Sequence, residues 1–117
     1  MTVQPVPGYT YKLVELLKVL DGDTVDCRIN LGFGLNAVMR FRIMSVDTPE
    51  TREAGWAEAK ETTRAWLTTR TGVLVHTYKS SQGSVGIGDG AFGRWMADFE
   101  HDGQRLSTLL RDKGWGV

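Results

Sequence analysis

The sequence predicts a single domain of the α+β class, mainly β, in which five strands form a small barrel. An abrupt Asp21-Gly22 turn separates two strand-like stretches, and helix-like patterns occur at only two places in the chain. The predicted order is strand, strand, strand, helix, strand, strand, helix. That order has too many adjacent strands for a βαβ layout and too many helices for a sandwich. It fits the OB-fold plan of a five-stranded barrel with a helix between strands 3 and 4, here followed by a short C-terminal helix.

The first three strands are predicted to form a meander. Residues 9–20 begin β-branched and aromatic and become rich in leucine, so helix and strand both remain possible there. Residues 24–31 alternate between apolar and polar side chains, which indicates a half-buried strand. The glycine-rich stretch at 32–36 predicts a turn, and residues 38–46 predict the third strand.

A helix is predicted next, because a set of residues recurs at spacings of three and four. The set is Trp56, Ala59, Thr63, Trp66, Leu67 and Arg70. The two tryptophans share one stripe, so both are predicted to pack against the sheet, and Gly72 is predicted to end the helix. Strands are predicted at 73–79 and 92–100, and a short leucine-rich helix is predicted to end at Gly114.

The composition predicts one domain over residues 1–117, with residues 1–8 as a loose lead-in. Basic and acidic residues number 14 each, so the net charge is zero; this argues against tight non-specific binding of nucleic acid but allows a local positive cleft. Cys27 is the single cysteine, and its apolar neighbours predict a buried structural thiol. No signal peptide or membrane-spanning run is visible, so we expect no membrane partner. A monomer is favoured, and cysteine usage leans towards an intracellular location.

The stretch from Gly88 to Gly93 matches the dinucleotide-binding pattern G-x-G-x-x-G. That pattern requires a strand leading directly into it and a helix opening at its third glycine. Here the preceding strand is predicted to end at Lys79, and a strand pattern follows instead of a helix. The segment is therefore interpreted as a long connection between two strands, and a dinucleotide site is rejected.

Polar residues gather at the predicted strand ends. They are Asp21 and Asp23 in the first turn, Arg42 in the third strand, Asp47, Thr48 and Glu50 after it, and Arg94 after the glycine-rich segment. Crowded carboxylates repel one another unless a cation compensates them, and hard oxygen ligands favour Ca²⁺ or Mg²⁺ over zinc. Two guanidiniums match the geometry of phosphate. A metal, two phosphate-binding arginines and a further carboxylate together predict phosphodiester hydrolysis. His76 and His101 lack a metal-ligand spacing and are predicted to lie at the surface or rim.

The motifs that hold these residues resemble those of the staphylococcal nuclease (thermonuclease) family. They are DGDT at 21–24, FR at 41–42, VDTPET at 46–51 and FGR at 92–94, in that order along the chain. The closing LSTLLRDKGWGV is similar to a leucine-rich helix of the family that ends at glycine. DGDT alone is a weak signal, but the combination is specific and extends from about Tyr9 to Trp115.

The resemblance implies a Ca²⁺ site. Its ligands would be Asp23, Asp47 and the backbone carbonyl of Thr48, with Asp21 as an outer-shell partner. Three protein ligands are fewer than the 6 to 8 oxygens that Ca²⁺ takes, so water and substrate would complete the shell.

The resemblance also implies catalytic roles. Glu50 matches the general base that activates a water against phosphorus, and Arg42 and Arg94 match the arginines that bind the phosphate and stabilise its transition-state charge. Phe92 occupies a substrate-binding position where the family often has tyrosine, so it keeps stacking and loses a hydrogen bond. The expected activity is endonucleolytic cleavage of single-stranded DNA or RNA that leaves 3′-phosphates.

Two departures leave an alternative open. Gly90 and Ala91 stand where the family tends to carry polar residues, and we expect no counterpart, up to Val117, to an additional C-terminal helix of the family. OB-folds also bind single strands or proteins without cutting them. The alternative is therefore a weak or inactive module that binds single-stranded nucleic acid or a protein partner.

Overall fold

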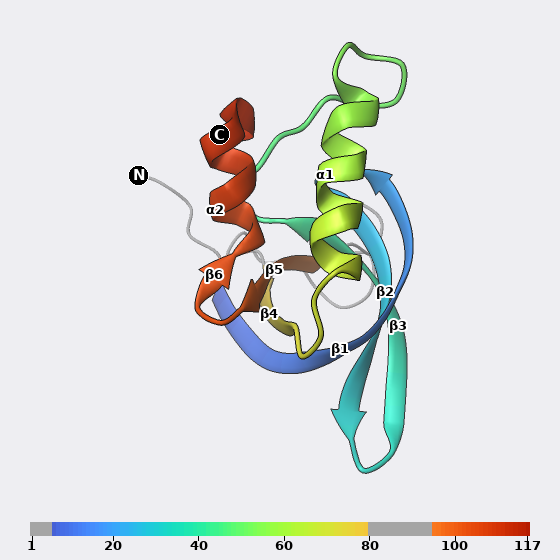
Figure 1. Cartoon of the computed structure of the whole chain (residues 1–117). Helices are drawn as coiled ribbons and strands as arrows, with labels where there is room; N and C mark the ends of the chain where they lie inside the picture. The colour runs from blue at the N-terminus through green and yellow to red at the C-terminus, as the bar shows by residue number, and fades with distance from the viewer. Residues whose placement is uncertain (1–5, 80–94) are drawn as a thin grey trace.

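Five strands close into a barrel in the computed structural model, which describes residues 6–79 and 95–117 (Figure 1). The strands are β1 (Val6–Asp21), β2 (Thr24–Gly32), β3 (Leu35–Ile43), β4 (Leu74–Lys79), β5 (Trp95–His101) and the short β6 (Gln104–Arg105). The helices are α1 (Trp56–Thr68), α2 (Leu106–Leu110) and a π-helical segment, η1 (Arg111–Trp115). The sheet order is β3-β2-β1-β4-β5-β6, and parallel pairing of β3 with β5 closes the barrel. The predicted OB-like α+β fold is confirmed, with α1 between the third and fourth strands.

β1 coils around the barrel because extra residues are inserted in it at regular intervals. Its register with β2 shifts three times, so that β1 advances three residues for every two of β2 in each repeat. The aligned pairs are Leu13 with Ile29, Leu16 with Cys27, and Val19 with Val25. Each such bulge bends a strand and increases its twist. The leucine-rich stretch where helix and strand were both possible is therefore a bulged strand, in which Leu13, Leu16 and Val19 recur every three residues.

Two predicted strand boundaries need correction, and a third lies partly outside the described residues. β1 begins at Val6 rather than Tyr9, because residues 6 and 7 pair with β4; only residues 1–5 of the predicted lead-in remain, and they lie outside the described residues. β3 covers 35–43 rather than 38–46, since the chain leaves the ladder and turns at Ser45, whose φ is 61°. β5 is described from Trp95, so residues 92–94 of its predicted range lie outside the described residues.

The core fills the barrel and the space beneath α1. Phe41 and Phe99 are fully buried at its centre, and their rings meet edge to face at 6.4 Å. Trp66 of α1 is buried in the same cluster, as predicted. Trp56 is only partly buried; its indole Nε1 donates to the Leu20 carbonyl at 3.3 Å and to Asp21 Oδ1 at 2.8 Å. The prediction that both tryptophans serve the core was therefore incomplete, because Trp56 binds the β1–β2 turn.

α1 lies directly against the β1–β2 turn. A Cβ at Gly22 would lie 2.8 Å from the Ala59 Cβ, so only glycine fits there without displacing the helix. The buried Thr63 hydroxyl donates to the Gly22 carbonyl at 2.5 Å. The helix thus fixes the turn from which Asp21 and Asp23 project.

The C-terminal segment is anchored on β5 and then reaches the loop after β3. Asp98 of β5 accepts hydrogen bonds from the backbone N–H of Ser107 at 3.1 Å and from its hydroxyl at 2.6 Å, which anchors the start of α2. Gly114 (φ 99°) then turns the chain, as predicted, so that the Trp115 carbonyl accepts from the Asp47 N–H at 2.8 Å. Across the described residues, no helix is both long and apolar enough to cross a membrane.

We expect Thr63→Val to lower the free energy of unfolding by about 1–3 kcal/mol, because it leaves the buried Gly22 carbonyl without its donor at nearly unchanged volume. Urea unfolding checks this. The matched control is Thr68→Val on the same helix, where the exposed hydroxyl bonds only the helix's own Arg64 carbonyl and the change should stay within about 0.5 kcal/mol. Equal losses in the two variants would contradict the role given to Thr63.

Cys27 is fully buried, which confirms the predicted structural thiol. Burial, together with the neighbouring Asp26 charge, raises its pKa to about 12. Because the thiolate is the reactive form, we expect a thiol-reactive disulfide reagent at mildly alkaline pH to label the folded protein only as fast as it unfolds. Labelling in native buffer at the rate measured in denaturant would show that the site is open.

Candidate active site

Asp23 is the buried centre of the candidate site. It follows the β1–β2 turn and is 6% exposed. Its Oδ1 accepts from the Thr24 hydroxyl at 3.0 Å and its Oδ2 from the Thr48 N–H at 3.2 Å. Its backbone carbonyl also accepts from the Ile43 N–H at 2.8 Å. The carboxylate is therefore oriented by donors from β2 and from the loop after β3, and the Asp23 backbone is held by β3.

Arg42 of β3 lies between the two predicted carboxylate ligands. Its Nη2 is 3.5 Å from Asp23 Oδ2 and 3.8 Å from Asp47 Oδ1. The same nitrogen donates to the Val46 carbonyl at 3.0 Å. Asp47 is largely exposed, whereas Asp23 is buried, so the guanidinium joins an inner and an outer carboxylate. The structure thus brings together Asp23, Arg42 and Asp47, as the sequence predicted.

Thr48 completes this group from the loop after β3. Its N–H is the donor to Asp23, and its side chain is buried. Its Oγ1 is the one buried side-chain polar atom in the described residues without a hydrogen-bond partner. Such an orphaned hydroxyl is unfavourable in a folded protein unless something binds it. The loop that holds it is pinned by the hydrogen bond from the Asp47 N–H to Trp115.

Asp21 lies at the side of the site and has partners of its own. Its Oδ1 accepts from the Trp56 indole at 2.8 Å and from the Thr51 hydroxyl at 3.4 Å. Both donors come from the segment between β3 and the first turn of α1. Sequence reasoning missed Trp56 and Thr51 here; the only signal was that VDTPET continues directly into the helical pattern.

Glu50 is exposed on the same loop. Its backbone is closed into a turn, since its N–H donates to Glu53 Oε1 at 2.6 Å and its carbonyl accepts from the Glu53 N–H at 2.9 Å. Its carboxylate makes no hydrogen bond or ion pair with the residues that the structure describes. The other predicted groups, Arg94 and Phe92, lie outside the described residues.

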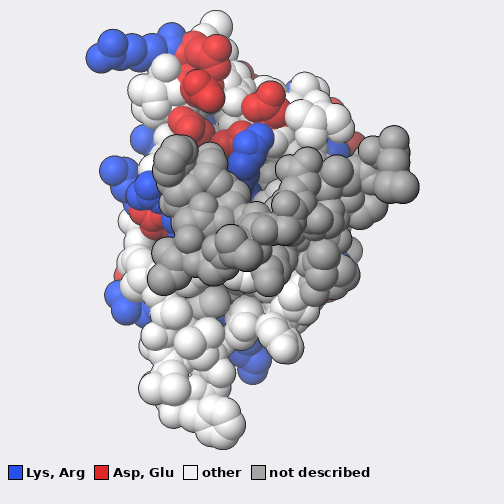
Figure 2. Space-filling view, turned by 180° about the vertical axis from the view of Figure 1, so that it is seen from behind, with Lys and Arg blue, Asp and Glu red and all other residues white. Residues whose placement is uncertain are grey.

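In the view from behind, acidic atoms lie next to a basic group in the upper part of the molecule, and the lower end carries few charges (Figure 2). The predicted ligand set contains two aspartates and a backbone carbonyl. Within residues 6–79 and 95–117 there is no cluster of three or more His, Cys, Asp or Glu side chains of metal-binding kind. Any metal here would therefore depend on backbone, water and substrate oxygens as well.

The histidines lie away from this group. His76 Nε2 is 2.7 Å from Glu100 Oε1, and its Nδ1 is 3.0 Å from the Thr10 hydroxyl. The hydrogen bond with His76 is the main cause that lowers the pKa of Glu100. Both histidines are partly buried at strand positions, as expected for rim residues.

Comparison with protein-family models finds no match for this chain, and comparison with curated proteins finds none either. The resemblance to staphylococcal nuclease therefore stays a prediction. The reason to regard these residues as a functional site is their arrangement in the fold.

Two arginines on β3 give a matched test of this geometry. We expect Arg42→Gln to lower the free energy of unfolding by about 1–2 kcal/mol, because buried Asp23 loses its counter-charge while the partial exposure of Arg42 limits the effect. Arg40→Gln should lower the free energy of unfolding by less than about 1 kcal/mol. Arg40 binds Asp26 more closely, at 2.7 Å, and lowers its pKa, but that arginine is largely exposed.

The measurement is urea unfolding of both variants and of double-mutant cycles with Asp23→Asn and Asp26→Asn. A coupling energy for Arg42 and Asp23 no larger than that for Arg40 and Asp26 would contradict the central place of Asp23.

Proposed function

We propose that this protein is a Ca²⁺-dependent nuclease of the staphylococcal nuclease type, which hydrolyses phosphodiester bonds of single-stranded DNA or RNA. One observation carries the proposal: a buried, fixed carboxylate, an exposed carboxylate and a guanidinium meet, although the β1–β2 turn, β3 and the following loop supply them separately. A purely structural ion pair needs one carboxylate. Two carboxylates around one arginine, next to the unpartnered Thr48 hydroxyl, favour binding of a cation and a phosphate.

The donor set fits Ca²⁺. All groups offered are hard oxygens: the Asp23 and Asp47 carboxylates and, in the same loop, the Thr48 carbonyl, with the unpartnered Thr48 Oγ1 close by in the chain. Bound there, the ion would act as a Lewis acid that draws electron density from a phosphoryl oxygen. Trp56 and Thr51 would keep Asp21 oriented behind these ligands.

Arg42 is suited to bind the phosphate. Its Nη2 is tethered to the Val46 carbonyl, while its Nε and Nη1 make no hydrogen bond with the described residues. The tether orients a planar group whose remaining donors can bond two phosphate oxygens at once. Donors fixed in place before reaction are worth about 10²–10³ in rate when they stabilise a developing oxyanion. Arg94 is proposed as the second such donor.

Glu50 is suited to act as general base. Its backbone is fixed by the turn with Glu53, and its exposed carboxylate has no partner among the described residues. It can therefore accept a proton from a water that attacks phosphorus, as the bond to the 5′-oxygen breaks and that oxygen takes up a proton. This order of events leaves the phosphate on the 3′ side. General-base catalysis of this kind contributes about 10²–10⁴ in rate.

We expect the purified protein to shorten heat-denatured DNA in the presence of Ca²⁺ and to stop when excess chelator is added. Glu50→Gln should lower the rate by about 10²–10⁴, since the amide cannot accept the proton. Glu58→Gln is the matched control, because that carboxylate is exposed on α1 and should leave the rate unchanged. Product length and end groups are read by electrophoresis before and after phosphatase treatment.

A folded protein that cuts nothing under any divalent ion would overturn the proposal and favour the binding module. Cleavage that survives the chelator would overturn the role of the metal. Equal activity in the Glu50 and Glu58 variants would overturn the assignment of the base.

A further inference from the structure

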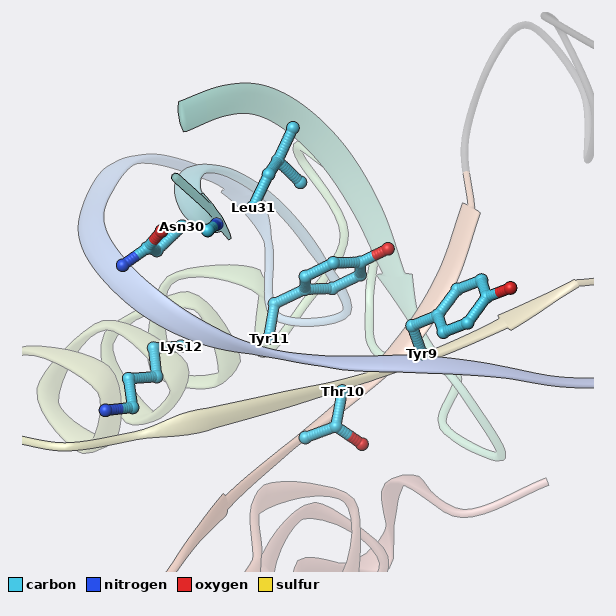
Figure 3. Close-up of a pocket in the computed structure, with 7 residues that line it drawn as sticks. Tyr9, Thr10, Tyr11, Lys12, Asn30 and Leu31 are labelled. Atoms are coloured by element: carbon cyan, nitrogen blue, oxygen red, sulfur yellow. Dashed lines mark hydrogen bonds between the residues drawn. The ribbon is translucent and has the colours of Figure 1, made fainter. Parts of the chain in front are cut away.

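A second concave surface lies where β1, β2 and β3 extend beyond the candidate active site. A cavity of about 490 Å³ opens there, and its lining is almost entirely apolar. The lining residues that matter here are Tyr9, Tyr11, Leu31, Met39, Phe41 and Trp95. We call this the aromatic pocket. A shallower hollow shares the two tyrosines and continues along residues 9–12 and 30–32 (Figure 3).

The two tyrosines form one wall. Their rings stand on the same side of β1, with Thr10 pointing to the other side (Figure 3). The ring centroids are 6.4 Å apart and the planes are inclined by 57°. Tyr9 is 75% exposed, which is unusual for an aromatic side chain with no described partner to cover it.

The backbone under Tyr9 is nevertheless fixed. The Tyr9 N–H donates to the Thr77 hydroxyl at 3.0 Å, and that hydroxyl donates to the Tyr9 carbonyl at 2.7 Å. A Cβ on Gly8 would come within 2.8 Å of the same hydroxyl, so the two strands are in close contact at this point. An exposed ring on a fixed backbone loses little conformational entropy when a ligand stacks on it.

The hollow beside the pocket carries a few polar side chains. Lys12 is the only charged side chain among the described residues that line the hollow, and it leaves β1 on the side of Thr10, opposite to the two rings (Figure 3). Asn30 uses its Oδ1 to accept from the Gly32 N–H at 2.7 Å, so its amide N–H groups remain as donors. Stacking rings and an amide donor match the face and the edge of an unpaired base.

We propose that the aromatic pocket binds an unpaired base of the nucleic-acid strand on which the candidate active site acts, a step that rests on the proposed function. Phe41 lines the pocket and Arg42 follows it in β3, while Trp95 pairs with Phe41 across the parallel ladder. Neighbouring residues of a β-strand face opposite sides. The bound nucleic acid therefore crosses the barrel rim between the aromatic pocket and Arg42. The stretch of β3 from Ala37 to Arg42 spans about 17 Å. A strand that occupies the roughly 4–16 nucleotides of an OB-fold site is long enough to cover this distance.

The test measures binding without cleavage. A fluorescently labelled thymidine oligonucleotide of about 12 residues, long enough to reach both places, is titrated with protein in chelator at low salt. We expect Tyr9→Ala to raise the Kd about 5- to 100-fold, the range of a lost base–aromatic stack, and Tyr9→Phe to stay near wild type. Phe33→Ala is the matched control, since Phe33 is fully exposed at the β2–β3 turn and lines neither surface.

A second measurement uses Ca²⁺ and cleavage. Tyr9→Ala should raise the KM for the long oligonucleotide by a similar factor and leave turnover of a dinucleotide unchanged, because the short substrate does not reach the pocket. Cleavage with no effect of Tyr9→Ala on the Kd or on this KM would overturn the pocket assignment and leave the nuclease standing. Tyr9-dependent binding without any cleavage would overturn the nuclease and leave the pocket. An equal loss in Phe33→Ala would also overturn the pocket, because it would show unspecific apolar binding.

Discussion

The contact between α1 and the β1–β2 turn holds the barrel and the candidate site in one frame. Gly22 has no room for a side chain because Ala59 lies against it, and the Thr63 hydroxyl satisfies its carbonyl. Asp21 and Asp23 flank this residue, and Trp56 at the start of the same helix bonds Asp21. A displacement of the helix would therefore move both carboxylates together. The stability of the core and the geometry of the site are coupled through one small contact, so a substitution there acts on both.

The sequence predicted those parts of the fold that leave a local signal. The alternation in β2 and the helical spacing in α1 identified both elements, because one face of each must be buried. β1 was ambiguous for a physical reason: three bulges turn the strand's period of two into a period of three, which looks like a helix over a short stretch. Bulges are set by pairing with β2, so the residue types of β1 alone do not distinguish a bulged strand from a helix.

The site was predictable to a similar extent and for a similar reason. Charged side chains whose type suggests a chemical role, such as Asp23, Arg42 and Asp47, were recognised from their motifs and do come together. The groups that position them were not. The Trp115 carbonyl that holds Asp47 is a backbone atom, and any residue could supply it. Trp56 was assigned to the core because its spacing matched Trp66, and only the fold shows that its N–H reaches Asp21.

The hydrogen bond between Asp47 and Trp115 also bears on the order in which the site forms during synthesis. During synthesis, the β1–β2 turn and the loop after β3 emerge early, whereas the segment that fixes Asp47 follows about 70 residues later, together with the Val46–Gly116 bridge. Parallel pairing of β3 with β5 likewise waits for the second half of the chain. A nascent chain thus carries the aspartates of the site long before it can arrange them. The arrangement of these residues is therefore complete only once η1 has been made.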